Sequence, residues 1–518
     1  MAMTQRATSP TRPAPATADT RAMRRWWALG AISLSIFVLA LDVTVLSVAL
    51  PTLAGALGAS EAELQWFVTA YILALVGAVL PAGLVGDRIG RKALLVGGLA
   101  LFLAGSVGAA YTTSSGAFIV ARVVLGLGGG AVIVMAVSLV TVMFDEAERP
   151  KAVGIWSAAN FLGLPAGPIL GGWILSNAWW GWIFLINVPV ALIALGAVVA
   201  LVPESRSTRA PRIDVPGLLL SVAGLVALVY GIVRAGEEGW GEGAALGFMA
   251  AGLLVLGGFA LWEARLARQP GGEPLVDLSL FRSRSFTWGT VLTAFGLFGL
   301  YGVLFVLPQY SQAIMGLDPQ GSGLRLLASI GGLVVGAAAS DRAAARVGAK
   351  LTVAVGLAAL AAGLGIGSTM SAASGDGFLA GWSFLAGLGG GFAFSTAASA
   401  ALVELTPERS GVGSALLQAV NKVAPAFAAA IMGSFLNAAY QAQVHLTGLP
   451  AAAAAATQGS VFGGLAVAQR LGSAAHLASV QSSFVAGLDD ALRVGATGVA
   501  IGVVAALAFL PSRRRAAL

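Results

Sequence analysis

Long runs of apolar residues alternate with short polar segments over most of the 518-residue chain. An α-helix needs about 20 apolar residues to cross the hydrocarbon core of a bilayer, and the runs have this length. The pattern therefore predicts an all-α membrane protein with fourteen transmembrane helices. The predicted spans are 26–50, 64–85, 93–111, 117–143, 152–175, 180–202, 215–234, 244–264, 286–312, 323–340, 351–371, 377–403, 411–438 and 490–510.

Three segments outside the spans have a different composition. Residues 1–25 are basic and rich in Pro, Thr and Ala, which predicts a disordered tail, and residues 511–518 form a short basic tail. The stretch 441–489 is predicted to be a long extracellular loop. It holds both histidines, His445 and His476, which we interpret as ordinary loop residues because two distant histidines do not define a metal site.

Three short motifs occur twice in the same order, which indicates an internal repeat. The pairs are LGLGGGA (125–131) with AGLGGGF (386–392), AERPKAVG (147–154) with PERSGVG (407–413), and GDRIGRK (86–92) with SDRAAARVGAK (340–350). The distance along the chain between the two copies of each motif matches the fourth span to the twelfth. Two adjacent six-helix halves would match the fourth span to the tenth. We therefore predict two six-helix bundles in parallel repeat, 26–202 and 286–510, with two inserted linker helices at 203–266.

The composition supports a membrane protein and excludes several other classes. The chain is 58% hydrophobic and 10% charged, whereas soluble proteins carry about 25% charged residues. The net charge of +7 would suit a nucleic-acid partner. The charges fall in short clusters between the spans, however, so we predict no binding to nucleic acid. Most Lys and Arg fall in the tails and alternate loops, which places both termini in the cytoplasm. The Ala- and Gly-rich makeup is typical of GC-rich bacteria, so we expect the inner membrane.

Two ionisable residues lie within predicted spans. Asp42 interrupts FVLALDVTVLSVALP (37–51), where a charge costs about 2.5–3.5 kcal/mol. It is either a packing carboxylate satisfied by a hydroxyl such as that of Thr44, or a proton-binding site, because burial raises the pKa of a carboxyl group. Arg122 in VARVVLGLGGG corresponds to Ser383 in the repeat. Packing does not require its charge, which favours a coupling role over a structural one.

The segment GLVGDRIGRK (83–92) places one acid among three bases on a short link between spans. The positive-inside rule and turn glycines explain part of this pattern. The charges could also hold the two halves together on the cytoplasmic side, with Asp87 facing the N-terminus of a helix. The residues of this motif are Gly83, Gly86, Asp87, Arg88, Gly90, Arg91 and Lys92.

The segment GLPAGPILGG (163–172) predicts a kinked and tightly packed helix. Small residues four positions apart allow close helix approach, and proline interrupts the helical hydrogen bonds. The residues concerned are Gly163, Gly167, Pro168, Gly171 and Gly172.

Together these segments resemble the motifs of the fourteen-helix drug:proton antiporters of the major facilitator superfamily, of the multidrug and quaternary-ammonium exporter type. LDVTVLSVALP is similar to the first-helix signature, GLVGDRIGRK to the loop motif, Arg122 with GLGGG to the fourth-helix motif, and GLPAGPILGG to the fifth-helix motif. LQWFVTAYILA (64–74) and WGWIFLINVPV (180–190) are also similar. The likeness covers most of residues 26–510.

The resemblance implies export of small amphipathic cationic or neutral drugs in exchange for protons, with no cofactor beyond the proton-motive force. It assigns coupling to Asp42 and Arg122, and it places Asp87 against the helix that begins near Gly411. We expect a monomer in the lipid bilayer. The candidate cavity residues are Trp66, Tyr71, Asn160, Gln418, Asn421 and Lys422.

The chain departs from the family pattern at three positions. Ser47 stands where the family often has Asn, Gly181 stands where it has Arg, and Lys422 lies in a late span where some dication exporters carry acids. Dications are therefore less favoured, and Lys422 is equally well interpreted as a structural or gating lysine.

Other functions remain to be weighed against drug export. A dedicated exporter of one endogenous metabolite or antibiotic, or a flippase for lipids and amphiphiles, would use the same fold. An ATP-driven pump would need G-x-x-x-x-G-K-[ST], which is missing from the sequence. A channel would need a ring of polar pore residues, and an enzyme would need a catalytic cluster; the sequence indicates neither.

Overall fold

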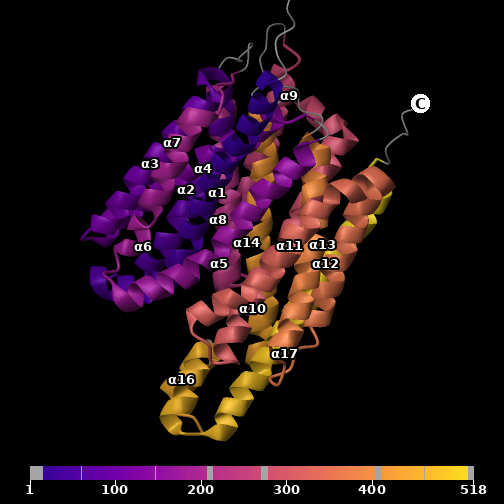
Figure 1. Cartoon of the computed structure of the whole chain (residues 1–518). Helices are drawn as coiled ribbons and strands as arrows, with labels where there is room; N and C mark the ends of the chain where they lie inside the picture. Colours follow the sequence, from indigo (N-terminus) through magenta and orange to yellow (C-terminus); the bar gives the residue numbers. More distant parts are fainter. Residues whose placement is uncertain are drawn as a thin grey trace, which may run out of the picture.

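The computed structural model describes residues 16–59, 61–145, 148–206, 214–269, 278–402, 410–459 and 461–511 (Figure 1). Fourteen helices within these ranges are long and apolar enough to cross a membrane, one at each predicted span, so the predicted fold class is confirmed. The helices of the first half are α1 Ala16–Leu57, α2 Glu61–Ile89, α3 Arg91–Tyr111, α4 Ser115–Met143, α5 Arg149–Asn177, α6 Trp182–Leu185 and α7 Asn187–Leu201.

The inserted pair consists of α8 Val215–Glu238 and α9 Gly243–Leu266. A short 3-10 helix, Leu278–Arg282, leads into the second half. The remaining helices are α10 Arg284–Ala313, α11 Pro319–Val347, α12 Ala349–Gly367, α13 Asp376–Leu402, α14 Ser410–Gln443, α15 Ala451–Gly459, α16 Val461–Leu471 and α17 Ala474–Phe509.

The two halves share one packing pattern. In the first half α4 packs against α2 and α3, and α1 contacts both α5 and α7. In the second half α13 packs against α11 and α12, and α10 contacts both α14 and α17. The inserted helices α8 and α9 pack on each other, and α8 also contacts α2 and α14, so it touches both halves.

The repeated glycines explain the close packing of α4 and α13. A Cβ at Gly126 would lie 2.5 Å from the backbone oxygen of Tyr71 in α2, and one at Gly128 would lie 2.7 Å from a backbone oxygen of α3. Gly387 and Gly389 of α13 meet the backbones of α11 and α12 in the same way. Small residues at these positions let the helices approach until their backbones touch.

The first transmembrane helix starts earlier than predicted. α1 begins at Ala16, so the predicted disordered tail is wrong for residues 16–25, while residues 1–15 lie outside the described part. Arg25 forms an ion pair of 2.8 Å with Glu148, and the Trp26 ring packs on Phe144. These contacts hold the start of the helix against the connection between α4 and α5.

The predicted loop at 441–489 is also wrong, because most of this segment is helical. The end of α14, α15, α16 and the first turns of α17 form a helical extension that projects from the second half (Figure 1). The Tyr440 hydroxyl donates to the Thr457 carbonyl at 2.8 Å, and Val480 and Phe484 are buried beneath it. Alanine-rich sequence forms helix readily even where its hydropathy is too low to indicate a membrane span.

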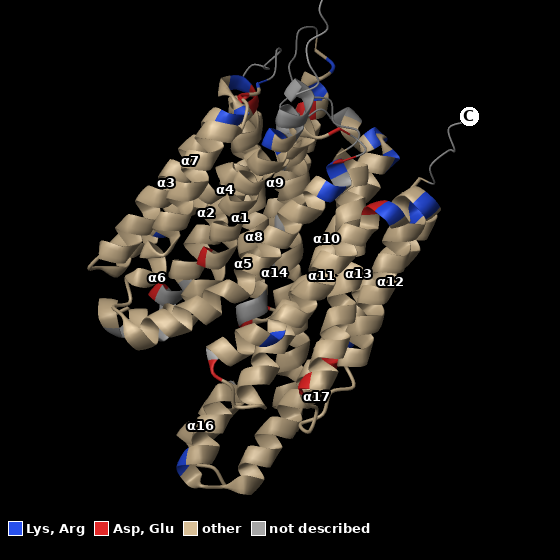
Figure 2. Cartoon of the chain, viewed as in Figure 1, with Lys and Arg blue, Asp and Glu red and all other residues tan. Residues whose placement is uncertain are grey.

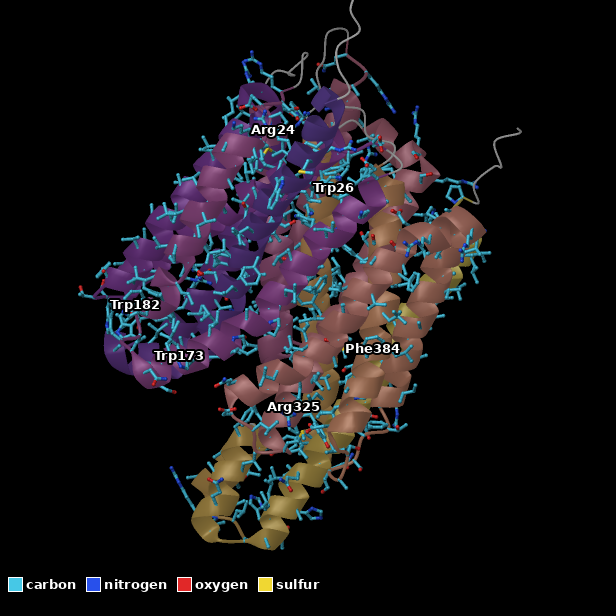
Figure 3. All side chains as sticks on the ribbon, viewed as in Figure 1. Arg24, Trp26, Trp173, Trp182, Arg325 and Phe384 are labelled. Atoms are coloured by element: carbon cyan, nitrogen blue, oxygen red, sulfur yellow. The ribbon has the colours of Figure 1, made fainter. Side chains whose placement is uncertain are left out.

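Charged and aromatic residues are distributed unevenly along the molecule. Figure 2 shows that Lys and Arg gather at the end where the C-terminus lies, which we call the basic end. Arg24 and Trp26 lie near this end, and Trp173 and Trp182 lie at the opposite end of the first half (Figure 3). Tryptophan at both ends of a bundle is typical of the two membrane interfaces.

Candidate functional site

The two intramembrane ionisable residues identified in the sequence lie against each other. Arg122 of α4 donates from Nη1 to Oδ2 of Asp42 in α1 at 2.9 Å. Asp42 is 0% exposed and Arg122 is 1% exposed. Each charge therefore neutralises the other in a region where either alone would be costly.

A third residue, Asn187, completes the shell around Asp42, and the sequence analysis missed it. Its Nδ2 donates to Oδ1 of Asp42 at 2.8 Å, and its side chain is fully buried. Pro189 has no N–H to bond the Leu185 carbonyl one turn earlier, and the helix is interrupted between α6 and α7 at this point. The sequence analysis noted the surrounding segment WGWIFLINVPV (180–190) but did not single out this residue.

The guanidinium of Arg122 has two further partners on α2. Its Nε donates to the Phe67 carbonyl at 2.9 Å, and its Cζ lies 4.4 Å from the centroid of the Tyr71 ring. The guanidinium is thus held by a carboxylate, a backbone carbonyl and an aromatic ring.

A cavity of about 500 Å³ lies between the two halves, beside this cluster. It is lined from the first half by α1, α2, α4 and α5 and from the second half by α10 and α14. The lining residues are Leu39, Ala40, Val43, Tyr71, Ile72, Leu75, Val76, Ile133, Asn160, Leu164, Val233, Tyr301, Phe305, Pro425, Ala429, Ala430, Gly433 and Asn437.

The candidate cavity residues do not all line a cavity. Tyr71 and Asn160 line the large one, whereas Gln418 and Asn421 line two smaller voids between the halves. Asn421 also accepts a hydrogen bond of 2.7 Å from Thr293.

Two candidates fall elsewhere. Trp66 is 44% exposed and stacks on Tyr230 with ring centroids 6.4 Å apart, so it does not belong to the described lining. The Lys422 side chain lies outside the described residues, although its backbone belongs to α14.

The inserted pair of helices forms part of the cavity wall. Val233 of α8 lines the cavity, and Trp240, between α8 and α9, donates from Nε1 to Ser434 Oγ of α14 at 2.7 Å. Glu242 accepts hydrogen bonds from the first turn of α9, and the bond from the Ala245 N–H is the main cause of its lowered pKa. The carboxylate thus caps α9 and anchors the connection next to Trp240.

The motif at 83–92 forms a single-residue link rather than a loop. α2 ends at Ile89, α3 starts at Arg91, and Gly90 between them has φ +121°, a conformation that favours glycine. A Cβ at Gly90 would lie 2.7 Å from Glu204 Oε1. Glu204 accepts from the N–H groups of Lys92 and Ala93 and thereby caps α3; the sequence analysis did not identify it.

Two charges of this motif, those of Asp87 and Arg91, form a buried ion pair. Arg91 bonds Asp87 Oδ1 at 2.6 Å with both side chains 1% exposed, and Arg91 also donates to Ser205 Oγ at 2.7 Å. These contacts bind the motif to the segment that follows α7. The proposed contact of Asp87 with the helix start near Gly411 involves side chains outside the described residues, and it stays a prediction.

The two halves are packed together at the basic end. Arg149 of α5 donates to the Leu402 carbonyl of α13 at 2.9 Å. A Cβ at Gly154 of α5 would lie 3.3 Å from that of Ala337 in α11. The large cavity is lined by later residues of α10 and α14, such as Phe305 and Asn437, and so lies toward the opposite end.

The glycines of GLPAGPILGG bring α5 against α1. A Cβ at Gly163 would lie 2.6 Å from the Phe37 carbonyl oxygen, and one at Gly171 would lie 2.7 Å from Val45 Cγ2. Gly167 faces Thr44 in the same contact, whereas Gly172 has nothing within 4 Å. Three of the four glycines therefore set the distance between the helix that carries Asp42 and the helix that carries Asn160.

Two repeated six-helix bundles around a central cavity with a buried ion pair define a two-bundle membrane transporter. The family model described as "Major Facilitator Superfamily" matches residues 32–429. The chain belongs to this superfamily, as its motifs suggested.

Curated relatives are named as resistance and export proteins. The chain is 35% identical over 411 residues to the tetracenomycin C resistance and export protein of Streptomyces glaucescens, covering 79% of this chain and 76% of that protein. It is 30% identical to the multidrug efflux pump LfrA of Mycolicibacterium smegmatis, covering 94% and 96%. It is 31% identical to the puromycin resistance protein pur8 of Streptomyces alboniger, covering 85% and 87%.

Solved structures agree in fold. The human organic anion transporter MFSD10 matches with a TM-score of 0.61 at 14% identity, covering 93% of this chain and 99% of that one. The proton:xylose symporter XylE matches with a TM-score of 0.56 at 16% identity, covering 95% and 97%. Identities this low show the fold alone.

Proposed function

We propose that the protein exports small amphipathic drugs in exchange for protons, with the central cavity as the substrate site. The observation that carries this proposal is the buried Asp42–Arg122 pair next to a cavity of about 500 Å³. A carboxylate in this position can take up a proton only by loosening its bond to the arginine. Protonation is thus linked to the packing of α1, α2 and α4 around the cavity.

The proposal includes a direction across the membrane. The basic end is assigned to the cytoplasm by the positive-inside rule, with both termini there and the helical extension outside the cell. An exchange that carries one net charge inward gains about 2.3 kcal/mol per 100 mV. This is enough for a substrate gradient of about 50-fold.

Export of a single antibiotic is the second candidate. It is favoured by relatives whose names refer to one compound, such as tetracenomycin C and puromycin. Coupling and fold would be the same in both cases, and the range of transported compounds distinguishes them.

The test is transport of a panel of neutral and cationic dyes into proteoliposomes under an imposed pH gradient. We expect the wild type to accumulate dye when the gradient is present and Asp42→Asn to lose this response. Asp376→Asn is the matched control, because Asp376 is an exposed carboxylate that pairs with Arg325 on the surface. Equal gradient-driven accumulation by the wild type and Asp42→Asn would contradict the coupling role of Asp42.

A further inference from the structure

The cavity between the two halves continues into a small polar end. A void of about 30 Å³ adjoins the cavity of about 500 Å³, and they share the lining residues Ile133, Asn160, Tyr301 and Pro425. The void is large enough for water or a small polar group but too small for an aromatic ring. Ser157, Gln418 and Asn421 also line it, whereas most residues around the large cavity are apolar.

The polar end points toward the basic end of the molecule. α5 begins at Arg149, which contacts the second half at the basic end. The void is lined by Ser157 of this helix, whereas the large cavity extends along it to Leu164. The two spaces together therefore form an amphipathic site with its polar part nearer the basic end.

Asn160 of α5 and Tyr301 of α10 lie where the two spaces meet, one from each half. The helices approach each other here, since the ring centroid of Tyr301 is 6.4 Å from that of Phe161. Both side chains are partly exposed because they face the cavity. The Asn160 amide and the Tyr301 hydroxyl have no hydrogen-bond partner among the described residues, and packing does not seal these atoms as it seals the Tyr71 hydroxyl.

The charges around the site favour an uncharged occupant. None of the described residues that line either space carries a charge. The neighbouring Asp42 and Arg122 already bind each other. Transfer of an ion into such a site is costly, because no described countercharge pairs with it.

We propose that Asn160 and Tyr301 form a hydrogen-bonding subsite for uncharged aromatic substrates that carry a group with both a donor and an acceptor, such as a carboxamide. This inference rests on the proposed role of the cavity as the substrate site, and it deepens that role by naming the substrate class. The amide of asparagine offers a donor and an acceptor, and the tyrosine hydroxyl donates to the substrate carbonyl. The apolar walls, including Leu75, Leu164 and Phe305, take the rings.

A substrate held in this way contacts both halves at once. Asn160 belongs to the first bundle and Tyr301 to the second, so both hydrogen bonds form only when the halves are in the relative position seen here. Substrate binding thereby stabilises this arrangement of the two bundles.

The experiment measures binding by equilibrium dialysis of the full-length protein in nanodiscs, with empty nanodiscs subtracted and no pH gradient applied. The probes share one ring system: an anthracene carboxamide, the corresponding methyl ester, which keeps the carbonyl but has no N–H, anthracene itself, and a trimethylammonium derivative of anthracene. We expect the wild type to bind the carboxamide most tightly.

Two variants remove the polar groups and keep similar side-chain volumes. Asn160→Leu and Tyr301→Phe should each weaken carboxamide binding about three- to tenfold, as expected for one hydrogen bond, and leave anthracene unchanged. Tyr301→Phe should also weaken binding of the ester, which still has a carbonyl oxygen. Neither variant should lower the midpoint of thermal unfolding, since neither side chain gives up a described partner.

The matched controls make the same exchanges away from the cavity. Asn177→Leu changes an exposed asparagine that bonds only its own helix, at Trp173. Tyr111→Phe changes a tyrosine that is 64% exposed at the end of α3. Neither control should change the binding of any probe.

Three results would overturn the inference: wild-type binding of anthracene or the quaternary derivative as tight as that of the carboxamide, unchanged carboxamide binding in both variants, or an equal loss for anthracene. A loss in Asn437→Leu without one in Asn160→Leu would also overturn it, because Asn437 lines the cavity toward the opposite end. The comparison of the probes on the wild type does not depend on any variant.

The outcome is independent of proton coupling, because no gradient is applied. Binding that follows the expected pattern without gradient-driven transport would reject the proposed function alone. Gradient-driven transport without the expected binding pattern would reject only the subsite.

Discussion

At the scale of single residues, the buried polar cluster consists of charges that the sequence identified and an amide that it did not. Asp42 and Arg122 stand out because a charge in an apolar run needs an explanation. Asn187 is uncharged and gives a much weaker signal, yet it binds the second carboxylate oxygen. The packing interpretation of Asp42 named a hydroxyl as its partner, whereas the structure supplies a guanidinium and an amide.

Replacing Asn187 tests how much this amide contributes. Asn187→Ala leaves a buried carboxylate oxygen without that donor, so we expect the free energy of unfolding to fall by about 1.5–3 kcal/mol. Asn177→Ala is the control, because Asn177 is exposed and its amide bonds only the backbone of its own helix, at Trp173. Thermal unfolding of both variants in the same detergent checks this, and equal midpoints would show that Asn187 is dispensable for stability.

At the scale of helices, glycine positions decide how closely the elements pack. The contact of α5 with α1 resembles that of α4 with α2. In both, glycine lets atoms of the partner helix come within about 3 Å of the position that a Cβ would occupy. Sequence spacing predicted one glycine-lined face on α5. It did not show which helix that face would meet, because many helices present a similar stripe.

Two glycines of the same motif provide a matched pair of substitutions. Gly167→Ala places a Cβ 2.7 Å from the backbone nitrogen of Val45, which should separate α5 from α1 and cost about 1–3 kcal/mol. Gly172→Ala meets no atom within 4 Å and should be neutral or stabilise the helix by up to about 1 kcal/mol. The midpoint of thermal unfolding should therefore fall in Gly167→Ala and stay the same or rise in Gly172→Ala. A larger loss in Gly172→Ala would contradict the described helix contact.

At the scale of the whole molecule, the cavity and the tight packing at the basic end both belong to the interface between the two halves. Residues of both halves and of the inserted α8 line the cavity, whereas α5 and α11 touch at the basic end through Gly154 and Ala337. In a transporter that works by rocking of two bundles, this contact must open when the site faces the cytoplasm.

A disulfide across this contact should stop the cycle. The chain has no cysteine, and Cβ atoms 3.3 Å apart at Gly154 and Ala337 need little movement to reach the separation of about 3.5–4.5 Å found in disulfides. We expect Gly154→Cys with Ala337→Cys to lose transport on oxidation and regain it on reduction. Dye transport in proteoliposomes before and after reduction measures this.

The control pair for this experiment lies within one half. Gly108→Cys with Ala121→Cys would join α3 to α4, where the Cβ separation is 3.8 Å, and oxidation should leave transport unchanged. Full transport by the oxidised Gly154–Ala337 pair would show that these helices do not separate during the cycle.

The sequence by itself determined the spans, the repeat, the inserted helices and the two buried charges, because membrane solvation requires apolar runs of fixed length and makes each interruption conspicuous. It failed for residues 16–25 and for most of 441–489, which are helical without forming apolar runs of membrane-spanning length. Only the tertiary structure decided that Asp42 meets Arg122 80 residues away and that Asn187 joins them. These relations depend on how helices distant in sequence pack, which no local pattern specifies.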